Sequence, residues 1–240
     1  MLADALAAQR MHITSAVPYG DLADLVAGAA EWDLGLVLSP FKPAVRAIGA
    51  ELSPSARDTG IVDTLLTNGG RLHGVNTNSW ALAEALAVAL RGQPPGHVLL
   101  LGAGATARSA VLGLTRRWPG CRVTVSARRE DAARELAEAF GIGDMSPVAT
   151  AEAGADVVIN STTWGETADS ETMPFGYPLE RLLRPGVTFF DLNNRLGALQ
   201  QQALAAGCVV LSGTLMQRMT HACRAAAARR CVEEATDDQA

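Results

Sequence analysis

Short apolar runs alternate with longer segments of helical periodicity along most of the chain. In the first part, the runs at 11–14 and 34–39 predict strands. The segments 19–33 and 40–52 predict helices, and each opens near a Pro or an Asp, as helix starts favour. Alternation of this kind is typical of βαβ units and a parallel sheet.

The segment 60–77 has a different pattern. Two apolar runs flank the sequence Asn68-Gly69-Gly70, which is a hairpin turn signal. A strand, a turn and a second strand are therefore expected here, followed by a helix over 79–92.

The Pro/Gly stretch at 93–96 is the clearest break in the pattern, and we place a domain boundary there. Beyond it the chain predicts a buried strand, a glycine turn and a helix over 97–118. Four further strands are expected, with helical stretches between them, at 122–128, 156–163, 187–193 and 208–213. Repeated units of this kind form a doubly wound sheet.

The fold class predicted is therefore α/β, with two α/β domains. Residues 1–92 form a substrate domain, and residues 93–213 form a Rossmann-like dinucleotide-binding domain. The last long helix, about 214–234, is expected to pack back on the first domain.

Composition narrows the classes of function. The 240 residues are 48% hydrophobic and carry a net charge of -5, without a basic patch, so neither nucleic acid nor a membrane surface is an expected partner. No apolar run approaches the length of a membrane span, and the N-terminus is a poor signal peptide, so a cytoplasmic location is expected. The four cysteines lack metal-ligand spacing, so no metal site is expected.

Residues 102–107 read G-x-G-x-x-A directly after a predicted strand and at the start of a predicted helix. Gly102 allows a tight turn, and Gly104 allows the backbone to approach a pyrophosphate at the helix N-terminus. Ala107 is small enough for close packing of helix on strand. This context predicts dinucleotide binding rather than a merely structural turn.

The tip of the next strand indicates which dinucleotide. An NAD site would place Asp or Glu there, but this chain has Ala127, Arg128 and Arg129. Two guanidinium groups suit a 2′-phosphate, whereas cations at a helix start are otherwise unfavourable. NADP is therefore the expected cofactor.

Several motifs together resemble the shikimate dehydrogenase family over nearly the whole chain. They occur in the family's order: SPFK (39–42), GIVDT (60–64), GVNTNSW (74–80), GAGATARSA (102–110), VSARR (125–129), VINSTTWG (158–165) and GTLMQRMTHA (213–222). The resemblance implies an oxidoreductase with a substrate domain and an NADP domain. It also implies a lysine–aspartate pair for proton transfer.

The family's lysine corresponds to Lys42, the only lysine in the sequence. Arginine cannot lose its proton, whereas a partly buried lysine can, so Lys42 is the expected general acid for a ketone or imine. The alternative is a surface lysine at a helix start.

The family's catalytic aspartate is replaced by Asn78, which cannot exchange a proton, while a family asparagine is replaced by Asp63. Because both positions line the family's substrate pocket, the carboxylate is hypothesised to have moved: Asp63 would accept a substrate hydroxyl and Asn78 would supply the amide. Independent changes in a disused pocket are the alternative.

The resemblance places further differences at the substrate end. The chain begins near the helix that follows the family's first strand, so its two carboxylate-binding serines are not expected, and the family's threonine is Leu38, beside Ser39. Asn194 and His221 stand where a tyrosine and a glutamine are expected. Ordinary shikimate is therefore a poor candidate substrate, and a polar ring without that carboxylate is expected instead.

Two sets of binding residues follow from the resemblance. The substrate site is expected to use Ser39, Asn76, Asn194 and His221 beside Lys42, Asp63 and Asn78. The cofactor site is expected to use Gly102, Gly104, Ala105, Thr106, Ala107, Arg108, Ala127, Arg128, Arg129, Ser161, Thr162, Thr163, Gly213 and Met216.

Three functions remain open from the sequence. The first is an NADP-dependent reductase of altered specificity in a specialised biosynthetic pathway. The second is a non-catalytic NADP(H)-binding homologue or partner subunit, and the third is a genuine shikimate dehydrogenase with a replaced carboxylate site. A homodimer is a further open expectation, because a missing first strand would leave a sheet edge unpaired.

Overall fold

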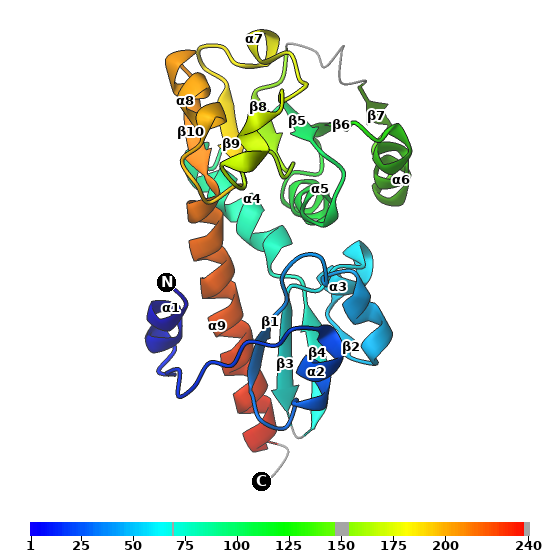
Figure 1. Cartoon of the computed structure of the whole chain (residues 1–240), viewed down its shortest axis with the longest axis vertical. Coiled ribbons are helices and arrows are strands. Elements are labelled where there is room, and N and C mark those ends of the chain that lie inside the picture. Colours follow the sequence, from blue (N-terminus) through cyan, green and yellow to red (C-terminus); the bar gives the residue numbers. More distant parts are fainter. Residues whose placement is uncertain (69, 147–153, 238–240) are drawn as a thin grey trace. The chain divides into compact units, whose positions relative to one another are not determined.

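The structure is a computed structural model of the whole chain, and it describes residues 1–68, 70–146 and 154–237. The chain divides into two compact units (Figure 1). Unit 1 comprises Met1–Ala81 and Arg218–Ala240, and unit 2 comprises Leu82–Gln217. The division falls within helix α4 (Asn78–Ala89), ahead of the Pro/Gly stretch at 93–96.

Unit 1 is built on a four-stranded mixed sheet with the order β1-β3-β4-β2. Its strands are β1 (Leu34–Leu36), β2 (Glu51–Leu52), β3 (Thr64–Asn68) and β4 (Arg71–Val75). β3 and β4 pair antiparallel, which confirms the two strands predicted over 60–77, although Gly69 of the predicted turn lies outside the described residues. β2 pairs parallel to β4 at one edge.

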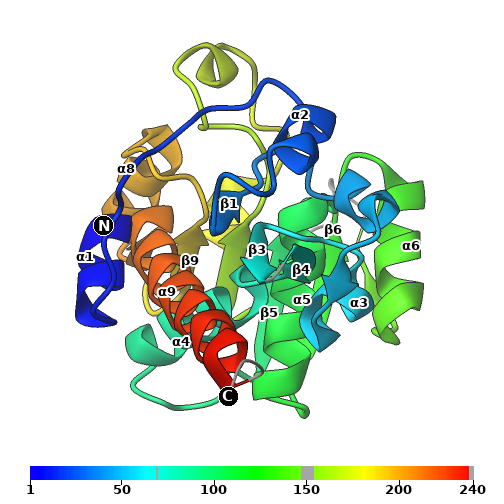
Figure 2. The same cartoon turned by 90° about the horizontal axis from the view of Figure 1, so that it is seen from below.

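Helix α9 (Gly213–Asp237) packs on this sheet through its C-terminal part (Figures 1 and 2). Leu66 of β3 forms a buried cluster with Ala228 and Cys231 of α9. The amide of Asn68 donates a hydrogen bond to the Cys231 carbonyl at 3.1 Å. A second cluster, formed by Val37, Val45, Ala56, Val62 and Leu65, is packed by residues that include Leu22 and Leu25 of α2 (Leu22–Ala27).

Two predictions in this unit are wrong. Residues 11–14 form no strand. The Met11 N–H donates to the carbonyl of Leu6 in α1 (Leu2–Ala8) and so does not pair with a neighbouring strand. Residues 40–52 form turns, the 3₁₀ helix η1 (Ala44–Ile48) and β2 rather than one helix. Pro43 lacks an N–H and disfavours the helical conformation at the preceding residue, and Gly49 ends η1 in the left-handed conformation, with φ of 75°.

Helix α3 (Pro54–Thr59) was not predicted, although its boundaries are visible in the sequence. Ser53 accepts a hydrogen bond from the Ala56 amide as N-cap, and Pro54 occupies the first turn. Gly60 ends the helix in the left-handed conformation, with φ of 69°.

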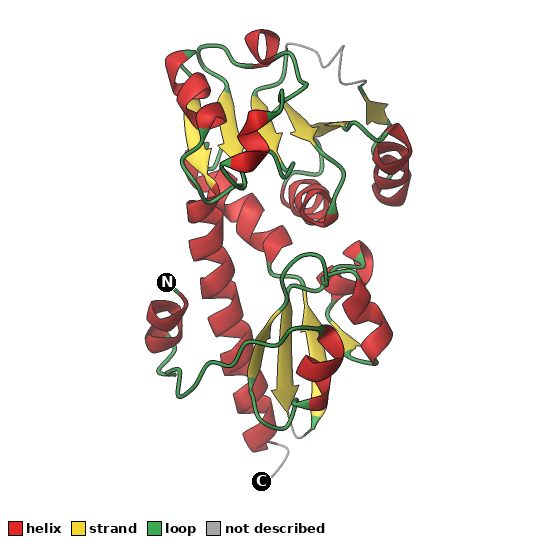
Figure 3. Ribbon diagram, viewed as in Figure 1, coloured by secondary structure: helices red, strands yellow, loops and turns green. Residues whose placement is uncertain are grey.

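Unit 2 contains a six-stranded parallel sheet with the order β10-β9-β8-β5-β6-β7 (Figure 3). The strands are β5 (His97–Leu101), β6 (Arg122–Ser126), β7 (Asp144–Met145), β8 (Val157–Asn160), β9 (Thr188–Asp191) and β10 (Val209–Ser212). Counted along the unit, this is the Rossmann order 3-2-1-4-5-6, with its switch point between β5 and β8. The predicted α/β fold is confirmed, and β7 was not foreseen.

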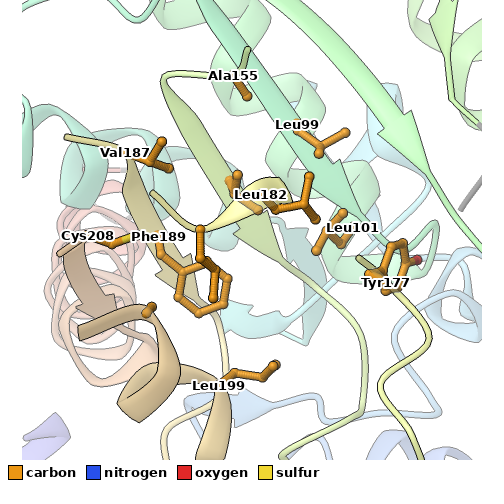
Figure 4. Close-up of a cluster of buried hydrophobic side chains, with 12 residues drawn as sticks. Leu99, Leu101, Ala155, Tyr177, Leu182, Val187, Phe189, Leu199 and Cys208 are labelled. Carbon is orange, nitrogen blue, oxygen red and sulfur yellow. The ribbon is translucent and has the colours of Figure 1, made fainter. Parts of the chain in front are cut away.

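The helices of unit 2 cover this sheet. Besides the part of α4 from Leu82 on, they include α5 (Ala105–Arg117), α6 (Glu130–Phe140), α7 (Leu179–Leu182), α8 (Ala198–Ala205) and the short 3₁₀ helix η3 (Asp169–Thr172). Figure 4 shows the core on one face, where Leu99, Leu101 and Phe189 of the strands meet Leu182 and Leu199 of α7 and α8. Helix α6 packs against β6 and β7, and α5 contacts α6.

No helix in the described ranges is long and apolar enough to cross a membrane.

Candidate functional site

The glycine loop after β5 lies at the switch point of the sheet in unit 2. Gly102 has φ of 101°, and a Cβ there would lie 2.9 Å from the Ser161 hydroxyl after β8. The Gly102 amide donates to the Ser126 carbonyl of β6 at 2.8 Å. Only glycine fits this position, because the loop after β5 passes between the ends of β6 and β8, the strands on either side of β5.

Helix α5 begins directly after this loop and lacks a side-chain cap. Gly104 is its N-cap residue, and among the described residues the helix has no side-chain cap hydrogen bond. A Cβ on Gly104 would meet nothing within 4 Å, so the space above the helix start is open. Such a helix start, with N–H groups that carry a partial positive charge and no side-chain cap, is the kind of place where proteins bind anions.

The tip of β6 places two arginines in solvent. Arg128 and Arg129 are both exposed, whereas Ala127 is buried. Such side chains can reach a 2′-phosphate without first breaking a buried contact. Arg108, on the first turn of α5, lies with its guanidinium 5.7 Å from the centre of the Phe140 ring.

Two residues at this tip were not foreseen. Tyr177 donates a hydrogen bond to the Ser126 carbonyl at 3.0 Å, and burial raises the pKa of Tyr177 to about 12, against the nearby charge of Arg128. Ser126 Oγ is the one buried side-chain oxygen or nitrogen atom that lacks a partner among the described residues. An unpaired buried hydroxyl beside the glycine loop is a group that a bound nucleotide could satisfy.

The ends of β8 and β9 are held together by side chains. Ser161 donates to the Leu101 carbonyl at 2.7 Å, and Thr162 bonds to Asn160 Oδ1 through both its N–H and its hydroxyl. Asp191, which is buried and was also missed, accepts from Asn160 at 3.0 Å and from Gln200 at 3.1 Å. Burial raises its pKa, and these hydrogen bonds oppose the rise. Thr163 is exposed.

The segment after β8 carries an aromatic stack. Trp164, Phe175 and Tyr177 follow one another with ring centres 5.2 and 4.9 Å apart. Glu171 forms a 2.6 Å ion pair with Arg195, which lowers the pKa of the carboxyl. The stack extends from Trp164, after β8, to Tyr177, which bonds to Ser126 at the end of β6.

Gly213 is required where α9 begins. A Cβ at this position would clash with the carbonyl group of Leu192, and the Gly213 amide donates to the Asn193 carbonyl at 3.1 Å. Met216, one turn further on, is buried. The helix can therefore start close against the loop after β9.

In unit 1, Asp63 lies just before β3 and is fully buried. Its carboxylate accepts hydrogen bonds from the hydroxyls of Thr64 and Thr77, each at 2.6 Å. It also accepts from the backbone amides of Thr77 and Asn78, each at 2.9 Å. Arg224 of α9 lies 3.8 Å from the same carboxylate.

These contacts make Asp63 the cap of helix α4. A carboxylate offers about four lone-pair sites, and four hydrogen bonds occupy them. These hydrogen bonds come from Thr64, Thr77 and Asn78, and Arg224 adds a charge of opposite sign. The geometry therefore argues against the expected role of Asp63 as acceptor for a substrate hydroxyl.

Asn76, expected to bind substrate, also serves the start of α4. Its Oδ1 accepts from the Ser79 amide at 3.2 Å, and its Nδ2 donates to the Thr59 hydroxyl at 2.8 Å. Asn76 is 3% exposed. Its amide thus joins α3 to α4.

Asn78 is the first residue of α4, and its side chain contacts α9. Thr220 donates from its hydroxyl to Asn78 Oδ1 at 3.3 Å.

His221 lies on α9 beside Arg224 and is 8% exposed. Its Nδ1 is 3.5 Å from an Arg224 nitrogen, and Arg224 also donates to the Thr64 hydroxyl at 2.9 Å and to the Asp63 carbonyl at 3.2 Å. Burial, and then the charge of Arg224, lowers the pKa of His221. Arg224 was missed, although residues three and four apart on a helix share a face, as Thr220, His221 and Arg224 do.

The remaining candidates lie nearer the surface. Lys42 is half-buried, and its carbonyl accepts from the Val62 amide at 3.1 Å, one residue before Asp63. Ser39 is exposed in the same unit. Asn194 is exposed in unit 2, where its carbonyl accepts from Thr214 at 3.3 Å.

Within the described residues, no group of three or more His, Cys, Asp or Glu side chains could hold a metal ion.

The curated proteins most similar in sequence include several with one and the same name. A shikimate dehydrogenase (NADP(+)) of Oleidesulfovibrio alaskensis is 32% identical over 188 residues, which is 74% of this chain and 63% of that protein. One of an Exiguobacterium strain is 31% identical over 188 residues, 78% of this chain and 68% of that protein. No protein-family model matches the sequence. The chain spans 63% and 56% of the lengths of the first two curated relatives.

Solved structures show the same architecture. A shikimate 5-dehydrogenase of Thermus thermophilus, solved in complex with shikimate, is 26% identical with a TM-score of 0.78. The alignment covers 99% of this chain and 93% of that one.

Proposed function

The chain belongs to the shikimate dehydrogenase family, and on that premise we propose that it is an NADP-dependent oxidoreductase. The observation that carries the proposal is the glycine loop and uncapped start of α5 at the switch point of a Rossmann-ordered sheet. A pyrophosphate binds at such a place because N–H groups and the helix dipole favour an anion there.

The residues present fit this cofactor. Gly102 and Gly104 leave room in the loop, the amides from Ala105 to Ala107 would hold the phosphates, and the exposed Arg128 and Arg129 would supply charge for the 2′-phosphate. When bound, NADPH supplies a hydride. An NAD-selective carboxylate at the β6 tip is absent from the sequence.

Lys42 is proposed to donate the proton. An ammonium has three donors and can pass one to the oxygen of a ketone as negative charge develops there. Asn78 cannot take a proton and Asp63 is occupied by its four hydrogen bonds, so neither replaces Lys42. Asp63 acts instead as a positioning residue that holds Asn78 at the start of α4.

The substrate is proposed to be a small polar cyclic ketone, alcohol or imine without a carboxylate at the family's position. Leu38 replaces a hydroxyl donor and is 66% exposed, and only Ser39 beside it offers a hydroxyl. Desolvating a carboxylate without donors would cost several kcal/mol.

A non-catalytic NADP(H)-binding protein is the second candidate. One observation favours it. The buried carboxylate of Asp63 caps α4, and its hydrogen bonds leave it no site for a proton donor of a substrate. It predicts cofactor binding without turnover of any ketone.

Two measurements decide between these functions. NADPH fluorescence is titrated with the protein, and NADPH oxidation is followed at 340 nm with a panel of cyclic ketones and imines, with the shikimate couple as control. Lys42→Arg keeps the charge but cannot release a proton, so turnover should fall by about 10²–10⁴-fold while NADPH affinity is unchanged. Absence of NADPH binding would refute both candidates, and equal turnover by Lys42→Arg would refute the role of Lys42.

A further inference from the structure

The carbonyl oxygen of Ser126, at the end of β6, accepts hydrogen bonds from two other parts of unit 2. The amide of Gly102 in the glycine loop donates to it at 2.8 Å, and the hydroxyl of Tyr177 donates to it at 3.0 Å. A carbonyl oxygen has two lone pairs, so these two hydrogen bonds fill it. The loop after β5, the end of β6 and the segment after β8 therefore meet at one atom.

The ring of Tyr177 is held by packing. The side chain is 8% exposed and belongs to the buried cluster that contains Leu101 and Leu182 (Figure 4). Its ring centre lies 4.9 Å from that of Phe175. Because the ring is packed in this way, its hydroxyl is already ordered before a cofactor binds.

The phenol lies close to both places proposed to bind the phosphates of NADP. Burial raises the pKa of Tyr177 to about 12, and the charge of Arg128 and the backbone of Gly102 oppose the rise, so both groups are near the phenol. Gly102 belongs to the loop proposed for the pyrophosphate. Arg128 follows Ser126 by two residues, at the strand end proposed for the 2′-phosphate. The single O–H of Tyr177 bonds to the Ser126 carbonyl, so the phenol acts on the two sites through the backbone.

We propose that Tyr177 is a positioning residue, which fixes the spacing between the pyrophosphate site and the 2′-phosphate site through the Ser126 carbonyl. The inference rests on the proposed function, because the two sites are those of NADP. A ligand that bridges both sites gains from a fixed spacing, since its second contact then forms at a high effective concentration. A ligand that fills only one site does not depend on that spacing.

The test removes the hydroxyl of Tyr177 and keeps its ring. Dissociation constants of the wild type and of Tyr177→Phe are measured by isothermal titration calorimetry on the full chain, with three probes that lack the nicotinamide. The probe 2′-phospho-ADP-ribose carries both the pyrophosphate and the 2′-phosphate. ADP-ribose carries only the pyrophosphate, and 2′-AMP carries only the 2′-phosphate. The matched control is Tyr19→Phe, the same change in the other tyrosine of the chain, which lies in unit 1.

Tyr177→Phe should weaken binding of 2′-phospho-ADP-ribose by about three- to tenfold, the size expected for one net hydrogen bond. Binding of ADP-ribose and of 2′-AMP should stay unchanged, and Tyr19→Phe should change none of the three. Unchanged binding of 2′-phospho-ADP-ribose by Tyr177→Phe, or an equal loss for all three probes, would overturn the inference and leave the proposed NADP site in place. If the wild type binds none of the probes, the proposed function fails and the inference fails with it.

Discussion

Two helix starts, one in each unit, face the same physical requirement and meet it differently. The first turn of any helix leaves N–H groups without helical partners and carries a partial positive charge. At α4 these groups bond to Asp63 and Asn76, both buried. At α5 Gly104 supplies no side-chain cap, and the space above it is open.

The difference distinguishes a structural carboxylate from a binding site. The α4 start is satisfied inside the protein, so Asp63 fixes the backbone that carries Asn78. The α5 start is left for an anion from outside. A buried carboxylate near a catalytic position is therefore no indication of acid–base chemistry until its hydrogen bonds are counted.

Removing the cap of α4 should have the largest effect. Asp63→Ala leaves Thr77, Asn78 and the buried Arg224 without their common partner, and should lower the free energy of unfolding by about 3–5 kcal/mol. Urea denaturation measures the loss. The control is Asp21→Ala, which removes the exposed cap of α2 and should cost about 1 kcal/mol. Equal losses in the two variants would contradict the account.

Adding a side-chain cap to α5 should make its start resemble that of α4 and weaken cofactor binding. Gly104→Asp places a carboxylate where the phosphate is expected, so NADPH affinity should fall about 100-fold by repulsion and competition for the same amides. Gly120→Asp is the control, since a Cβ there also meets nothing within 4 Å. Fluorescence titration gives both affinities, and an unchanged value in Gly104→Asp would place the cofactor elsewhere.

A comparison of NADPH with NADH tests whether the arginines at the end of β6 bind the 2′-phosphate. Arg128→Ala should weaken NADPH about tenfold, because a charge-assisted hydrogen bond to a phosphate is worth about 1.5–3 kcal/mol before solvent screening. NADH affinity should not change. If both cofactors weaken equally, Arg128 supports the loop rather than the 2′-phosphate.

The smallest effect concerns Tyr177. Its pKa is raised to about 12, so the stabilising contribution of the neutral phenol is complete below the unfolded value near 10 and is lost as pH rises toward 12. The stability difference between wild type and Tyr177→Phe should shrink by about 1 kcal/mol from about pH 9 to about pH 11. A difference that stays constant with pH would show that the phenol is not buried as described.

The sequence predicted unit 2 better than unit 1, for a physical reason. Strands such as His97–Leu101 and helices such as Ala105–Arg117 are continuous apolar patterns, and the glycine motif depends on local backbone geometry. In unit 1, Pro43 interrupted a pattern that otherwise resembled a helix.

The role of Asp63 could not be predicted, because it depends on contacts between residues far apart in the sequence. Its partner Thr77 belongs to the segment after β4, and Arg224 belongs to α9. No spacing rule relates these positions. The helical spacing of Thr220 and Arg224 was the one available signal.

The most direct test compares the two helix starts in one titration. Backbone amide ¹H–¹⁵N signals are followed while 2′,5′-ADP, which carries the phosphates without the nicotinamide, is added to the full chain. The amide signals of Ala105 and Thr106 should shift on binding, while those of Thr77 and Asn78 should stay in place. Shifts at Thr77 and Asn78 with none at Ala105 and Thr106 would contradict the assignment of the anion site to α5.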